Sequence, residues 1–215
     1  MRTKALIIVV VALIAMPVAA NAKDGDWILR ARVINVSPNE SSDEIGDFGS
    51  RVAVDSATTL EVDATYNFTK RLGIEVIAAT TGHDLSARGG ALAGASLGSV
   101  KVLPPTAVLQ FHPLPGGLFD FYFGAGINYT IFYSYDLSSD LAGLGVTDIK
   151  FDNSFGLAGD IGINFNLGHH LLINADVKYI QISTDADIKV GSSTLDSVSV
   201  DIDPWVFGAG VGWRF

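Results

Sequence analysis

Apolar and polar residues alternate along much of the chain with a period of two. In the segment 60–68 every even-numbered residue is apolar, and the residues between them are Glu61, Asp63, Thr65 and Asn67. Successive side chains of a β-strand point to opposite faces, so this pattern predicts a strand with one apolar and one polar face. Seven further segments with this pattern lie at about 27–33, 72–78, 103–111, 119–131, 155–167, 171–179 and 207–215.

Eight such segments predict an all-β fold, an eight-stranded antiparallel transmembrane β-barrel with the up-and-down order of a meander. An even number of strands brings both chain ends to one side and leaves no free sheet edge for lipid to meet. The connections alternate in length, as they do in outer-membrane barrels, where short turns face the periplasm and long loops face outward. Short turns are expected near 69–71, 113–117 and 168–170, and long extracellular loops near 37–56, 84–98, 133–150 and 185–197.

The apolar parity is interpreted as the lipid-facing side of the barrel. Alternation alone would also suit a soluble, lipocalin-like barrel with the apolar face inside. The polar parity, however, is rich in glycine, which fits a narrow interior better than a solvated surface. The last segment is long enough to cross a bilayer at a tilt. Outer-membrane lipids are therefore expected partners, and the terminal Phe215 is expected to act as the assembly signal through which the C-terminal strand engages the barrel-assembly machinery.

The first residues have the features of a cleavable signal peptide. Arg2 and Lys4 precede an almost wholly apolar run, which ends in Pro17 and a small-x-small cleavage site at residues 20–22. An anchoring helix is disfavoured because the apolar run is short. The prediction is a signal peptide over 1–22 and an outer-membrane barrel over 23–215.

Composition excludes several classes of function. Beyond residue 22 the chain has 12 basic and 23 acidic residues, a formal charge of −11, so nucleic acid is a poor partner. It has no cysteine, which suits an oxidising periplasm. Its four histidines and its loop aspartates match neither a catalytic triad nor an EF-hand loop, so neither an enzyme, a cofactor nor a metal site is expected.

The polar parity carries eight charged residues that should face the lumen. They either fill the barrel as mutual ion pairs or take a direct part in transport. Towards the loop end, apolar residues occupy the inward-facing positions. This pattern predicts an apolar vestibule above a charged floor. The vestibule would admit apolar solutes, and the floor would block ions. The charges are Arg30, Arg32, Glu61, Asp63, Glu75, Asp160, Asp176 and Lys178, and the apolar path is Ile77, Ala79, Val108, Phe132, Ile180 and Ile182.

Several motifs, taken in order, resemble the outer membrane protein W family. They are Leu103-Pro104-Pro105-Thr106 with Gln110-Phe111-His112, then the run 123–130, then the run 152–156, and finally Asp203-Pro204-Trp205-Val206 ahead of Arg214-Phe215. The resemblance covers residues 27–215. It implies an eight-stranded barrel in the outer membrane of a Gram-negative bacterium, with a narrow and largely apolar interior. It also implies porin-like, passive passage of small hydrophobic molecules, of alkanes in the similar AlkL-type proteins, with lateral exit into the membrane.

Two readings of function stay open from the sequence. Pro104 and Pro105 could disrupt the wall and form the lateral opening, since each removes a ladder donor, or they could simply kink the barrel. A continuous cavity that reaches the wall near them would favour a conduit. A lumen filled from end to end by charged side chains would favour a structural or surface-interaction barrel, serving adhesion, stress tolerance, or phage or toxin docking.

Overall fold

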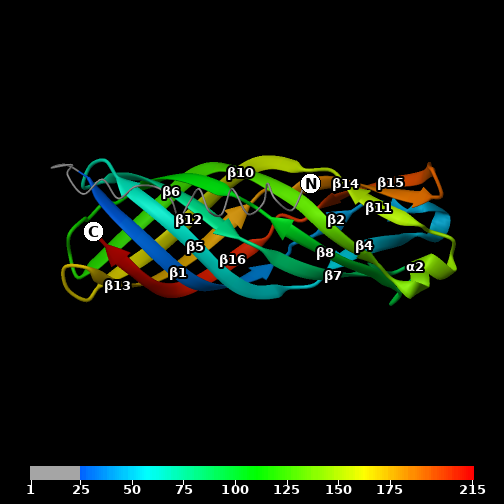
Figure 1. The fold of residues 1–215 in the computed structure, drawn as a ribbon, viewed down its shortest axis with the longest axis horizontal. Helices are drawn as coiled ribbons and strands as arrows, with labels where there is room; N and C mark the ends of the chain where they lie inside the picture. The colour runs from blue at the N-terminus through cyan, green and yellow to red at the C-terminus, as the bar shows by residue number, and fades with distance from the viewer. Residues whose placement is uncertain (1–24) are drawn as a thin grey trace.

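The computed structural model describes residues 25–215, so the predicted signal peptide lies outside the described residues. These residues form a long β-barrel that continues at one end into a β-structured extension (Figure 1). Eight strands close the barrel through antiparallel neighbours, with β10 paired to both β9 and β12. They are β1 (Asp26–Ser37), β5 (Ala57–Asn67), β6 (Leu72–Ala79), β9 (Thr106–Phe111), β10 (Phe119–Leu137), β12 (Ser154–Asn166), β13 (Leu171–Ile180) and β16 (Trp205–Arg214). The predicted eight-stranded meander is confirmed.

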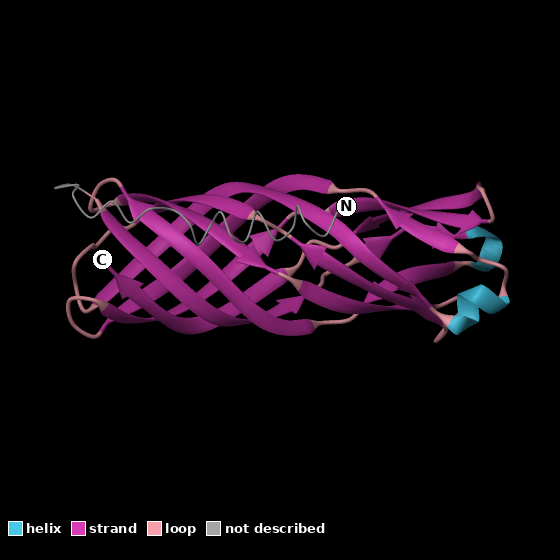
Figure 2. Cartoon of the chain, viewed as in Figure 1, coloured by secondary structure: helices cyan, strands magenta, loops and turns pink. Residues whose placement is uncertain are grey.

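The first and last strands of the barrel pair with each other and bring both ends of the described chain to one end of the barrel. There the backbone N–H of Phe215 donates to the carbonyl oxygen of Trp27 at 2.9 Å. The short connections also lie at this end, which we call the turn end (Figure 2). Within residues 25–215, no helix has the length and apolar character to cross a membrane.

The four segments predicted to be long loops contain β-strands, and this corrects the sequence interpretation. They rise beyond the barrel as two sheets, one of order β10-β8-β7-β4-β3 and one of order β11-β14-β15-β2. Paired hairpins satisfy their own backbone hydrogen bonds and bury alternate apolar side chains between the sheets, which polar loops could not do. The added elements are β2 (Ser41–Ser42), β3 (Glu44–Ile45), η1 (Gly46–Phe48), β4 (Ser50–Val54), β7 (Thr81–Arg88), β8 (Ser96–Leu103), α2 (Ser139–Gly143), β11 (Asp148–Phe151), β14 (Ser183–Val190) and β15 (Ser193–Asp201).

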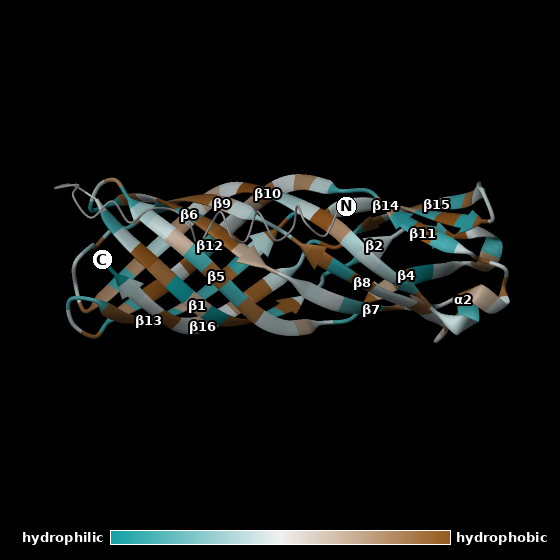
Figure 3. Ribbon diagram, in the orientation of Figure 1, coloured by the Kyte–Doolittle hydropathy of each residue, from teal (hydrophilic) through white to brown (hydrophobic). Residues whose placement is uncertain are grey.

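The outer surface of the barrel is apolar, as the alternation predicted. Leu60 and Phe155 are 70% and 68% exposed, although both are large hydrophobic residues. Hydrophobic and hydrophilic positions alternate along the strands in Figure 3. Aromatic pairs flank this surface, with Trp27 against Tyr66 at the turn end. Such a belt is what lipid requires, because amphipathic rings favour the headgroup level.

Candidate functional site

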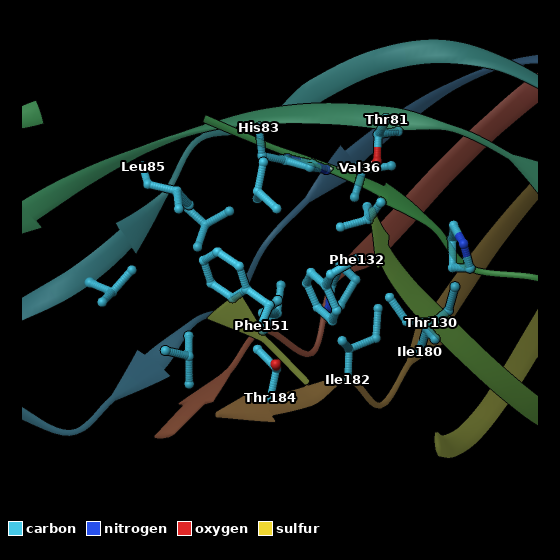
Figure 4. Close-up of a pocket in the computed structure, with 18 of the residues that line it drawn as sticks. Val36, Thr81, His83, Leu85, Thr130, Phe132, Phe151, Ile180, Ile182 and Thr184 are labelled. Carbon is cyan, nitrogen blue, oxygen red and sulfur yellow. Dashed lines mark hydrogen bonds between the residues drawn. The ribbon is translucent and has the colours of Figure 1, made fainter. Parts of the chain in front are cut away.

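An apolar cavity lies where the barrel passes into the extension. It encloses about 90 Å³. Figure 4 shows side chains from several strands converging on it, among them Leu85, Phe132, Phe151, Ile180 and Ile182. Because aliphatic and aromatic side chains dominate its lining, it suits an apolar molecule rather than an ion or a sugar.

The cavity exists because the inward parity of the barrel strands changes from charged to apolar along their length. On β1 the inward residues Arg30 and Arg32 are followed by Ile34 and Val36. The same change occurs on β13, where Ile180 follows Lys178. Two residues along a strand advance about 7 Å, so the cavity lies one such step beyond the charged layer.

Lys178 and Glu61 form the floor of this cavity. The Nζ atom of Lys178 lies 2.9 Å from Oε1 of Glu61 and 2.7 Å from Oδ2 of Asp176. Thr106 and Thr130 also line the cavity, at the level where its lining becomes polar. The floor therefore separates an apolar chamber from a charged interior.

Beneath the floor, a network of ion pairs fills the lumen. Arg32 contacts four carboxylates at 2.8–2.9 Å, those of Glu61, Asp63, Glu75 and Asp176. Arg30 lies 2.7 Å from Asp63 and 3.1 Å from Glu75, and the side chains of both arginines are fully buried. Charges in such a low-dielectric interior stay only when paired, and here they pair with one another across the lumen. The network occupies the lumen below the cavity.

Neutral polar side chains complete the network, and the sequence interpretation missed them. The amide nitrogen of Gln110 donates to Glu75 and to Asp160, both at 2.9 Å. Asn174 donates to the hydroxyl of Tyr122 at 3.0 Å, and Arg30 lies over the ring of Tyr122. All of these residues occupy the strand positions that the alternating pattern predicts to point into the lumen. The alternation was therefore the signal by which they could have been predicted.

The predicted lumen residues separate into two levels. All eight predicted lumen charges are buried, and the structure brings them together in or beside the network below the cavity. Ile77, Ala79, Phe132, Ile180 and Ile182 line the cavity above it. Val108 is buried but lies lower, opposite Glu75 in the β6–β9 register, and it does not line the cavity.

At Pro104 and Pro105 the wall passes from β8 to β9, and Pro104 lines the cavity. Hydrogen bonds nevertheless hold this break together. The carbonyl oxygen of Pro105 accepts from the backbone N–H of Tyr129 at 3.0 Å, and that of Pro104 accepts from the hydroxyl of Thr106 at 3.0 Å. The prolines thus interrupt the ladder at the depth of the cavity.

Much of the cavity lining comes from the extension and was not predicted. These side chains belong to the segments that were expected to be polar loops or lie within three residues of their ends, where isolated apolar residues gave no periodic signal. They include Ile45, Leu85, Leu97, Val100, Leu141, Ile149, Phe151, Val198 and Val200.

His83 is the one histidine in the described part of the chain that lines this cavity. Its Nδ1 atom lies 2.8 Å from the carbonyl oxygen of Asp55, and its Nε2 atom lies 2.9 Å from the hydroxyl of Thr81. Burial lowers the pKa of its imidazole below the ordinary value of 6.5, although Asp84 and Asp55 oppose this effect. The ring is therefore held neutral at the cavity wall.

Residues 25–215 contain no group of three or more histidine, aspartate or glutamate side chains placed to hold a metal ion.

A closed antiparallel barrel with an apolar outer surface is typical of outer-membrane β-barrel proteins. Residues 23–215 match the OmpW family, and the chain belongs to that family. Outer membrane protein W of Vibrio cholerae is 38% identical over 210 residues, which are 96% of each chain. The crystal structure of OprG from Pseudomonas aeruginosa superimposes with a TM-score of 0.82 at 37% identity, covering 90% of this chain and 97% of that one. Outer membrane protein AlkL of Ectopseudomonas oleovorans is 24% identical over 92% of this chain and 85% of its own. The protein is an outer-membrane barrel of a Gram-negative bacterium.

Proposed function

We propose that this protein is a passive conduit for small hydrophobic molecules, which enter from outside and leave sideways into the membrane, and that it is not an enzyme. The observation that carries the proposal is the position of the apolar cavity directly above the Lys178–Glu61 floor and the Arg32 network. A molecule that reaches the cavity has the membrane beside it and a sealed lumen below it.

The energetics favour apolar solutes. Burial of apolar surface recovers about 25 cal/mol per Å², so a solute that buries roughly 100 Å² gains about 2.5 kcal/mol. An ion gains nothing comparable and loses its hydration in a chamber with few polar partners. Selectivity therefore follows from desolvation, without a specific recognition group.

Axial passage would require the ion-pair network to come apart. Breaking a buried pair costs roughly 3–5 kcal/mol, and Arg32 alone makes four contacts. A sideways exit needs no such change, and the break at Pro104 and Pro105 is one place where the wall could yield.

The test is uptake of a small fluorescent aromatic or alkyl probe into lipid vesicles that carry the refolded protein. A sugar and a chloride salt serve as control solutes, and heat-modified gel mobility shows that the barrel is folded. We expect faster apolar uptake with no sugar or ion leak. Uptake equal to that of protein-free vesicles would reject the conduit and favour the surface-interaction function.

A variant pair locates the path. Ile180→Asp places a carboxylate in the cavity wall and should abolish the protein-dependent uptake while the barrel still folds. Ile180→Leu keeps the side chain apolar and should retain uptake. Equal uptake by the two variants would remove Ile180 from the path.

A further inference from the structure

A seam runs up the wall of the molecule between β10 and β11. Within the barrel, β10 pairs with β12 as far as Thr130 and Ser154. Above that pair, β10 continues to Leu137 with β8 on one edge, while β11 pairs with β14. In the described part of the chain no strand ladder joins β10 to β11. Two strand edges therefore face each other without backbone pairing, which is unusual in a closed wall.

Side chains close this seam. The amide of Asn153 bridges its lower end, since its Oδ1 atom accepts from the backbone N–H of Phe132 at 3.3 Å and its Nδ2 atom donates to the hydroxyl of Tyr129 at 3.1 Å. Above Asn153, the ring of Phe132 stacks on the ring of Phe151, with centroids 5.6 Å apart and planes 20° apart. Tyr135 packs on the other edge of Phe151 at 5.5 Å.

A β-bulge produces this aromatic arrangement. The β10–β8 register shifts between Phe132 and Ser134, so that Phe132 lies opposite Val102 and Tyr135 lies opposite Val100. Both valines are buried on the inner face of β8. Phe132 and Tyr135 are three residues apart, so in a regular strand they would point to opposite faces. The extra residue of the bulge, Tyr133, lets both side chains point inward at the seam.

The seam has a chamber on each side of it. The inner chamber is the apolar cavity, and the outer one is a surface groove between β10 and β11. Phe132, Phe151, Ile149 and Val100 line both, so a single layer of side chains separates cavity from exterior. Figure 4 shows Phe132 and Phe151 side by side within the cavity lining.

The groove opens at the outer boundary of the lipid-facing surface. Tyr129 and Phe155, the last outward aromatic pair of the β10–β12 ladder, lie just below it and are 45% and 68% exposed. Aromatic residues at this depth mark the level of the lipid headgroups. A molecule that passed between β10 and β11 would emerge at the level of the lipid headgroups.

We propose that the β10–β11 seam is the lateral portal of the conduit and that Phe132 and Phe151 are its gate. This inference rests on the proposed function and specifies its exit. Rotation of two aromatic side chains joins the cavity to the groove, whereas opening at Pro104 and Pro105 on the other edge of β10 breaks backbone hydrogen bonds such as that from Tyr129 to Pro105. Side-chain rotation is the smaller change.

The test is a reversible crosslink across the seam, which the absence of native cysteine makes possible. The variant Phe132→Cys/Phe151→Cys is joined by a short bifunctional thiol reagent with a reducible linker, and uptake of the same fluorescent apolar probe into vesicles is measured before joining, after joining and after reduction. The matched control is Lys101→Cys/Ser134→Cys, which joins β10 to its paired neighbour β8 at the same depth.

We expect loss of the protein-dependent uptake when the seam is joined, recovery on reduction, and no change in the control pair. Unchanged uptake with the seam joined would overturn the portal while leaving the conduit intact. If the unmodified protein gives no uptake, the proposed conduit function itself is rejected. This outcome differs from rejection of the portal alone, in which the unmodified protein takes up the probe and the joined seam does not change uptake.

Discussion

Lys178 and Glu61 pair at 2.9 Å across the lumen, from β13 to β5, at the lower boundary of the apolar cavity. Each is also tied to Arg32 or to one of its partners, since Glu61 lies 2.8 Å from Arg32 and Lys178 lies 2.7 Å from Asp176. The pair is therefore both the floor of the cavity and the top of the ion-pair network. Changes at this level should affect the stability of the barrel and the shape of the cavity together.

Replacement of Lys178 by Met should destabilise the barrel by about 3 kcal/mol, because Glu61 and Asp176 are then left with Arg32 as their shared partner. The free energy of unfolding is measured by urea titration of the refolded protein in lipid vesicles. Adding Glu61→Gln to Lys178→Met should restore part of the loss, since it removes the excess negative charge. A double variant less stable than the single one would contradict this account.

Replacement of Arg32 by Met should cost more, about 5 kcal/mol, because one change leaves four buried carboxylates short of a cation. The same urea titration measures it. Arg51→Met is the matched control, since Arg51 pairs with Glu44 at 3.8 Å on the surface and such pairs contribute about 0–1 kcal/mol. Equal effects of the two substitutions would show that the network does not stabilise the barrel.

Replacement of Gly210 by Ala should destabilise the barrel by about 1–3 kcal/mol through overpacking. A Cβ atom at Gly210 would collide with the carbonyl oxygen of Ala31 and with Cα of Arg32 on the neighbouring strand. Gly159→Ala is the control, because its Cβ atom would meet its nearest neighbour, the carbonyl oxygen of Gly124, at an ordinary 3.7 Å. Thermal unfolding followed by gel mobility should separate the two variants, and a normal midpoint for Gly210→Ala would refute the close strand contact.

Acidification should weaken the folded state through His83. Its pKa is lowered by burial in the folded protein, while the unfolded chain keeps the ordinary value of 6.5, so the unfolded state binds more protons below that pH. The stability that a neutral His83 provides is present above pH 6.5 and is lost as the pH falls towards the folded-state pKa. The drop in thermal midpoint between pH 7.5 and pH 5.5 should be smaller in His83→Gln than in the natural protein. An equal drop in both would assign the pH dependence to other groups.

The local pattern of the sequence was enough to predict the barrel strands and the direction of their side chains. The segment 60–68 illustrates why, since lipid accepts Leu60 and Val62 on one face while the lumen accepts Glu61 and Asp63 on the other. Parity is a property of neighbouring residues, so no knowledge of partner strands is needed.

The extension could not be predicted in the same way. β14 and β15 have few apolar residues in weak alternation among serines and aspartates, and they become strands because Ala186 pairs with Val198 and because β15 is held between β14 and β2. Their apolar residues become a cavity wall because a second sheet covers them. Both conditions are set by residues distant in sequence.

The sequence by itself determined which residues face lipid and which face the lumen, and it offered mutual ion pairing as one of two interpretations of the inner charges. The tertiary structure decided the depth of each residue and the neighbours it meets. Val108 shows the difference, because its parity is right but the β6–β9 register places it opposite Glu75, below the cavity. Phe151 shows it too, since a residue that lay in none of the predicted strands becomes one side of an aromatic pair with Phe132. The physical reason is that parity follows from the backbone of one strand, whereas depth follows from the tilt and stagger of all eight strands around the barrel.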